Sequence, residues 1–117
     1  MSAVSFARVT ITRKRYPVVD DMGTQVADFS GNPATTTTIP GCWLEPIESV
    51  VEKDGRVAVL TGFTGTAPEG TDLDSFRDHI VHAGIEYELA GDAMPVKSPT
   101  GALNEVKFSI RRWRHAG

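Results

Sequence analysis

Few residues of this sequence have the chemistry of metal ligands or nucleophiles, and their spacing does not bring them together. His79 and His82 are three positions apart, which places two imidazoles on one face of a helix but on opposite faces of a strand. No third ligand follows at a spacing typical of a metal centre. Cys42 is the single cysteine and lies in an apolar stretch. We therefore expect a buried, unreactive thiol, with neither a disulfide nor a metal site.

Patterns typical of catalysis and cofactor binding are also missing. The chain has no Gly-x-Ser-x-Gly motif, and the two glycines of the stretch 62–66 lack the lysine of a phosphate-binding loop. Nothing in the sequence singles out two of the carboxylates between Glu69 and Asp92 as an acid–base pair, and a solvated acidic face explains them better. We expect no enzyme activity and no cofactor.

The charges are segregated along the chain. With 117 residues and 12.7 kDa the chain fits a single domain, residues 1–117, and its net charge is 12 − 15 = −3. That balance argues against a protein whose main task is to grip nucleic-acid phosphates. Seven acids and one base lie between Glu69 and Asp92, whereas four bases and no acid lie between Val106 and Gly117. Such a pattern suits either contact with a complementary surface, including another copy of the chain, or two solvated faces.

Apolar residues recur mainly with a period of two, which indicates strands with one buried face. The alternation is clear in residues 9–12, 85–90 and 106–111. Residues 35–39 are β-branched throughout, and the run continues in residues 42–44 after a break at Pro40-Gly41. Residues 56–61 are apolar on both faces, which is typical of a central strand.

Turn residues separate these strands. Asp54-Gly55 predicts a tight hairpin between residues 47–52 and 56–61, and Ala83-Gly84 predicts a weaker one between 79–82 and 85–90. Six or seven short antiparallel strands at this spacing predict an all-β fold, a small β-barrel or sandwich with a long loop after the first strand. A short helix over residues 72–83 is the alternative to a strand at 79–82, because three apolar residues there have helical spacing.

Residues 13–34 form a stretch that is longer than most loops without a function in compact domains. It contains two prolines and two glycines, with apolar side chains scattered between them. A mobile surface loop and a projecting segment that becomes ordered against a partner both fit this composition. The apolar content favours the segment that becomes ordered against a partner.

From about Thr10 onward, short motifs follow one another in a recognisable order. They are a Thr-rich strand ending in Ile39-Pro40-Gly41-Cys42, then Asp54-Gly55-Arg56, Pro68-Glu69-Gly70-Thr71-Asp72, Asp78-His79-Ile80, residues 84–91, and Ser98-Pro99-Thr100-Gly101 before a last strand ending in Arg111-Arg112. In this order and spacing the sequence resembles the head-to-tail stopper (head-completion, or head–tail connector) proteins of long-tailed bacteriophages, especially those of actinobacterial hosts. The stretches 74–77 and 113–115 depart from the family pattern.

The resemblance implies a small β-barrel that assembles as a ring, commonly of twelve copies and in some phages of six. Such a ring lies below the portal and adaptor, closes the DNA exit channel after packaging, and provides the platform for the tail terminator or tail tube. A long loop between early strands projects into the channel as a gate, and it corresponds here to residues 13–34. The residues expected in this gate are Arg13, Lys14, Arg15, Tyr16, Asp20, Asp21, Met22 and Phe29.

The segregated charges add an expected contact between copies, because a head-to-tail contact between unlike surfaces generates rings. The residues expected at this subunit interface are Lys107, Arg111 and Arg112 on one copy and Asp78, Glu86 and Glu88 on the next. Double-stranded DNA is expected to pass without specific binding, since each tight phosphate contact would hinder sliding. The acids Asp20 and Asp21 suit such a channel.

The first eight residues contain no apolar stretch of signal-peptide length, and no window of the sequence approaches about 20 apolar residues. We therefore expect no membrane contact, assembly in the host cytoplasm and residence in the virion neck. Two alternatives stay open. One is another ring-forming neck protein, a tail terminator or tail-completion protein. The other is a small nucleic-acid-binding β-barrel, whose affinity for short DNA would fall steeply with salt.

Overall fold

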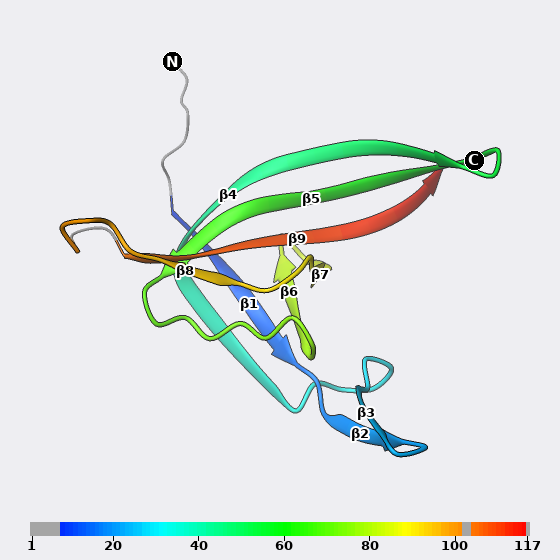
Figure 1. The fold of residues 1–117 in the computed structure, drawn as a ribbon, viewed down its shortest axis with the longest axis horizontal. Helices are drawn as coiled ribbons and strands as arrows, with labels where there is room; N and C mark the ends of the chain where they lie inside the picture. Colours follow the sequence, from blue (N-terminus) through cyan, green and yellow to red (C-terminus); the bar gives the residue numbers. More distant parts are fainter. Residues whose placement is uncertain (1–7, 102–103, 117) are drawn as a thin grey trace.

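The computed structural model describes residues 8–101 and 104–116, and the segment before Arg8 lies outside it. This part of the chain forms nine strands and no helix, so the all-β prediction is confirmed. The strands are β1 (Val9–Arg15), β2 (Val18–Asp21), β3 (Thr24–Ala27), β4 (Thr35–Lys53), β5 (Arg56–Pro68), β6 (Asp78–His82), β7 (Ile85–Leu89), β8 (Met94–Val96) and β9 (Glu105–Ala116) (Figure 1). None of the described residues belongs to a helix that could cross a membrane.

Six strands close into an antiparallel barrel in the order β5-β4-β1-β6-β7-β9, and the pairing of β5 with β9 completes the circle. The short strand β8 follows β7 along the same edge of β9, where Pro95 lies opposite Val106. Proline is tolerated at position 95 because β8 is an edge strand. Gly62 and Gly65 allow the close approach of neighbouring strands, because a methyl group at Gly62 would overlap the carbonyl oxygen of Ile110.

The predicted break at Pro40-Gly41 is a bulge inside one long strand, not the end of a strand. Val9 pairs with Cys42 and Ile11 with Ile39, so β4 has one more residue than β1 between these two pairs. Gly41 has a φ of 76°, a conformation that favours glycine. The bulge bends β4, which pairs with β1 before it and with β5 after it.

The core lies inside the barrel and is lined by the inward rows of the strands. Val106, Phe108 and Ile110 are buried, as the alternation in the sequence predicts. They pack with residues of the other barrel strands, which include Ile11, Ile39, Cys42, Ile80 and Leu89. Ile85 departs from the prediction: it lies at the start of β7 beside the turn and is 37% exposed.

The helix considered for residues 72–83 does not form. Residues 78–82 are strand β6, which pairs with both β1 and β7. Before it, the amide of Asp78 donates to the carbonyl of Asp74 at 2.9 Å, which closes a single turn. The carboxylate of Asp78 accepts the amide of Asp74 at 2.7 Å and fixes that turn. The local pattern is helical, but the pairing on both sides favours a strand.

The long loop predicted over residues 13–34 is shorter than expected and largely structured. Residues 13–15 are the end of β1, and residues 18–27 form the hairpin β2–β3, which projects from the barrel (Figure 1). Met22 and Gly23 form its tip with φ angles of 52° and 87°. The amide of Gly23 also donates to the carboxylate of Asp20 at 3.0 Å.

The strands β4, β5 and β9 continue together beyond the barrel as a second projection (Figure 1). We call this three-stranded extension the arm and define it as residues 48–53, 56–61 and 112–116. Hydrogen bonds join β5 to a strand on each side, so the central position predicted for residues 56–61 is confirmed. The faces of the arm are less covered than this central position suggests, since Val57 of β5 is 37% exposed and Val50 of β4 is 64% exposed.

Candidate functional site

The hairpin β2–β3 is held to the barrel by a cluster on the outer face of β1, β6 and β7. We call it the hairpin anchor: Lys14, Tyr16, Phe29, His79 and Glu86. Phe29, just after β3, stacks on the ring of His79 with 4.1 Å between ring centroids and an interplanar angle of 5°. Tyr16 meets Phe29 edge-on at 5.0 Å. The base of the hairpin therefore rests on a fixed aromatic platform.

Glu86 is the polar centre of the hairpin anchor. Its Oε2 accepts the hydroxyl of Tyr16 at 2.7 Å and lies 2.7 Å from Nδ1 of His79, while its Oε1 accepts Nζ of Lys14 at 3.2 Å. Burial alone would raise the pKa of Glu86, but these three hydrogen bonds outweigh it and hold the pKa below its ordinary value. Burial, with the hydrogen bond to Glu86, raises the pKa of Tyr16 to about 12.

A second cluster closes the end of the barrel from which the hairpin leaves. Asp78 is fully buried and takes two hydrogen bonds from the guanidinium of Arg15, at 2.8 and 2.9 Å. Arg15 also reaches Asp72 at 3.0 Å, and this contact lowers the pKa of the Asp72 carboxyl. Arg13 donates to the carbonyl of Asp72 at 2.8 Å. Planar guanidinium groups suit such two-point contacts, so this end of the barrel is rigid.

The residues predicted in the channel gate lie in two different places, at the barrel and at the hairpin tip. Arg13, Lys14 and Arg15 belong to β1, and their side chains are engaged at the barrel. This corrects their assignment to a projecting loop, because strand pairing with both β4 and β6 extends to residue 15. Tyr16 is buried, whereas Asp20, Asp21 and Met22 are exposed around the hairpin tip, where Met22 is 99% exposed. The candidate gate is therefore the hairpin tip alone.

The residues predicted at the subunit interface are also divided. Asp78 has no exposed surface, so it cannot meet a neighbouring subunit, and its prediction is corrected. Glu86 belongs to the hairpin anchor, and Glu88 accepts Nε of Arg111 within the chain at 2.9 Å. Lys107 and Arg112 are exposed and form no ion pair in the described part of the chain. A contact between copies stays a prediction, with these two bases as its available members.

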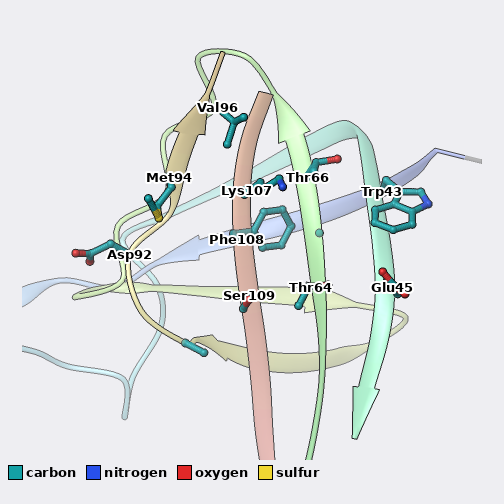
Figure 2. A pocket seen from close by; sticks show the side chains of 12 residues that line it. Trp43, Glu45, Thr64, Thr66, Asp92, Met94, Val96, Lys107, Phe108 and Ser109 are labelled. Carbon is teal, nitrogen blue, oxygen red and sulfur yellow. The ribbon is translucent and has the colours of Figure 1, made fainter. Parts of the chain in front are cut away.

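An open groove of about 580 Å³ lies beside β8 and is lined by residues of β4, β5 and β9. Figure 2 shows Asp92 and Met94 from the β8 side and Trp43 from β4 on the other side. The aromatic ring of Phe108 and the amine of Lys107 lie between them on β9. A smaller groove of about 330 Å³ adjoins it at Trp43 and Lys107.

The groove pairs aromatic and aliphatic surface with charges of both signs, since Glu45 and Asp92 line it together with Lys107. No sequence motif marks it, because its lining residues come from four strands and from the segment between β7 and β8. Proteins bind single-stranded nucleic acid with successive aromatic platforms in a basic groove, whereas this groove has the partly buried indole of Trp43 and the acids Glu45 and Asp92.

Residues with metal or nucleophile chemistry stay apart in the fold. His79 stacks in the hairpin anchor, while His82 meets Phe63 edge-on at 5.1 Å between ring centroids. No group of three or more His, Cys, Asp or Glu residues in 8–101 and 104–116 is placed to hold a metal ion. Cys42 is fully buried, and burial raises the pKa of its thiol to about 11, as expected for an unreactive cysteine.

No family model matches this sequence, and a search of curated proteins finds no match.

Proposed function

We propose that this chain is a head-to-tail stopper, a ring-forming neck protein of a long-tailed bacteriophage that closes the DNA exit channel and presents a platform for the tail. The order of motifs in the sequence supports the proposal. The observation that carries it is the β2–β3 hairpin: it projects from a closed barrel and arises from the stretch that corresponds to the channel gate in that family. The proposed partners are other copies of the chain, the adaptor or portal ring above, and the tail terminator or tail tube below.

The hairpin combines a rigid base with a small exposed tip. Its base is fixed by the stacking of Phe29 on His79 and by the buried Tyr16. Its tip carries two acids, Asp20 and Asp21, and the fully exposed Met22. Carboxylates do not neutralise phosphates, so such a tip can occupy a channel without gripping the DNA that slides through it.

The experiment that tests the function is a null mutation of the gene in the phage that encodes it, with particles examined by electron microscopy. A stopper predicts heads that lose their DNA and free tails of normal length, and purified protein added to the heads restores joined particles. A tail terminator predicts stable filled heads with tails of abnormal length. Joined, infectious particles formed without the protein contradict both assignments.

The role of the tip is tested separately by the substitution Asp21→Lys. A cation beside the passing phosphates adds a salt-dependent contact, so we expect slower DNA release at low salt and recovery at high salt. The matched control is Glu69→Lys, which makes the same change in net charge at an exposed acid in the loop after β5. Equal release rates for the wild type and Asp21→Lys would show that the tip does not face DNA.

A further inference from the structure

The arm has two strand edges with no hydrogen-bonded neighbour in the part of the chain that the structure describes. β4 pairs with β1 only as far as Cys42, so its residues 43–53 pair on one side only, with β5. β9 pairs with β7 at residues 110 and 111 and with β8 at residues 105–107. Its residues 112–116 therefore also pair with β5 alone. Such edges present free backbone N–H and C=O groups that can pair with a further strand.

The two open edges carry opposite charge. The free edge of β4 has three acids, Glu45, Glu48 and Glu52, and one base, Lys53. The free edge of β9 has Arg112 and Arg114 and no acid. Glu45, Glu52 and Arg112 are exposed, and none of the three forms an ion pair within residues 8–101 and 104–116. The arm thus has an acidic edge and a basic edge.

The acidic and basic residues also lie at the same level along the arm. Thr61 of β5 pairs with Glu48 on one side and with Arg112 on the other, and Val59 pairs with Val50 and Arg114 in the same way. If two copies lie side by side without a shift along the strands, Arg112 of one copy is next to Glu48 of the other. Charge and register therefore favour the same alignment.

This arrangement selects one kind of contact between copies. Two β4 edges would bring acid to acid and two β9 edges base to base, and such like-charge contacts disfavour a twofold dimer. Pairing of β9 with β4 brings unlike charges together and is head-to-tail, the geometry that produces rings or filaments. Because β4 and β9 are both antiparallel to β5, copies with the same orientation pair these strands in parallel.

We propose that copies of this chain join by parallel pairing of β9 residues 112–116 of one copy with β4 residues 48–53 of the next. The inference rests on the proposed function, since it names the contact that builds the ring. It also replaces the acidic partner expected from the sequence: Asp78, Glu86 and Glu88 have partners within the chain, whereas the acids of β4 lie on an open edge. A sheet extended in this way would run through successive arms.

Two charge reversals test the contact. Either variant alone should associate weakly, whereas a mixture of the two variants should associate again. Arg112→Glu places an acid opposite Glu48 of the next copy, and Glu48→Arg places a base opposite Arg112. We expect the wild type to self-associate in sedimentation velocity at low salt and to dissociate as salt is raised. Each variant alone should associate at least about tenfold more weakly. An equimolar mixture should recover association, since the acidic β4 edge of the first variant meets the basic β9 edge of the second.

Matched controls separate this contact from net charge and from folding. Lys97→Glu and Glu69→Arg make the same changes in net charge at exposed positions away from the arm edges and the hairpin tip, and they should associate as the wild type does. Circular dichroism checks that each variant is folded, and Glu52→Arg replaces Glu48→Arg if the latter does not fold. A wild type that stays monomeric to millimolar concentration overturns the proposal. So does undiminished association of either variant, or a mixture that fails to recover.

The outcome is distinguishable from a failure of the proposed function. A protein that restores joined particles to null-mutant heads, but whose mixed variants do not recover association, retains the stopper role and loses the β4–β9 contact. A protein whose mixed variants recover association, but which does not complete heads, retains the contact and loses the role.

Discussion

The barrel and the arm share three strands, β4, β5 and β9, and they differ in what covers those strands. In the barrel, β1, β7 and β8 pair with the outer edges, and inward residues such as Ile110 are fully buried. In the arm both edges are open, and Val50 is 64% exposed. Strand β9 therefore runs from the closed barrel into the arm, where its free edge can still form hydrogen bonds with another strand. We infer that the barrel provides stability and the arm provides contact.

The two regions also treat charge differently. In the barrel, the buried carboxylate of Asp78 accepts two hydrogen bonds from the guanidinium of Arg15. An unpaired carboxylate could not be buried there. In the arm, the β4 edge has two acids and one base and the β9 edge has two bases, and Glu52 and Arg112 form no ion pair in the part of the chain described. The buried carboxylate of Asp78 is satisfied within the chain, whereas Glu52 and Arg112 of the arm are exposed to another molecule.

The largest predicted effect comes from breaking the buried ion pair. Asp78→Ala leaves the largely buried Arg15 guanidinium with only the exposed Asp72 as a counter-charge, and we expect a loss of about 3–5 kcal/mol in the free energy of unfolding. Urea denaturation followed by fluorescence measures it. The comparison variant is Asp72→Ala, whose carboxylate also binds Arg15 but is 70% exposed and should cost less than about 1 kcal/mol. Equal losses for the two variants would contradict this account of the barrel.

The next prediction compares the core of the barrel with the arm directly. Ile110→Ala removes a fully buried side chain and should cost about 2–5 kcal/mol. Val50→Ala removes an exposed one and should change the stability of the monomer by less than about 0.5 kcal/mol. The same urea titrations test both at a concentration where the protein is monomeric. A large loss for Val50→Ala would mean that the arm is part of the folding core.

A smaller effect is expected from acid. The pKa of Glu86 is lower in the folded chain than its ordinary value of 4.5, so its contribution to stability is present above that pH and is lost as the pH falls through the lower, folded value. We expect Glu86→Gln to cost less than about 1 kcal/mol at neutral pH, since a third of the side chain is exposed to screening solvent. The stability curves of the wild type and the variant should converge below pH 4.5. Parallel curves down to low pH would show that the hairpin anchor does not depend on the Glu86 charge.

The last prediction concerns no change in stability. It compares the reactivity of two thiols on β4. Cys42 is buried in the barrel, and its thiol pKa is about 11, so iodoacetamide should modify it only as the protein unfolds. A cysteine introduced by Val50→Cys lies on the arm and should react at the rate of a free thiol in the folded protein. Mass spectrometry of the modified chain measures both rates. Rapid modification of Cys42 in the native state would show that the barrel opens locally.

The sequence predicts the strands whose local chemistry is decisive. Asp54-Gly55 and Ala83-Gly84 each form the predicted tight turn, with positive φ at both residues. The β2–β3 hairpin is missed because its turn is Met22-Gly23, which lacks the usual Asn or Asp signal, and the exposed strands beside it are only four residues long. Pro40-Gly41 predicts a break because the same residues that end a strand also form a bulge within one.

The site is less predictable than the fold because it depends on contacts between distant residues. Arg15 and Asp78 are 63 positions apart, and only the pairing of β1 with β6 brings them together. Glu86 likewise meets Tyr16 across 70 positions. The segregation of charge is visible in the sequence, but which acids remain free for another molecule depends on which ones the fold has already paired.

The most direct test of the central claim, that the barrel is closed while the arm joins copies of the chain, is cryo-electron microscopy of the virion neck at a resolution that separates strands. The account predicts a ring between portal and tail in which β9 of each copy runs parallel to β4 of the next, with the β2–β3 hairpins directed into the channel. A ring whose arms stand apart with both edges in solvent, or a neck that lacks this chain, would contradict it.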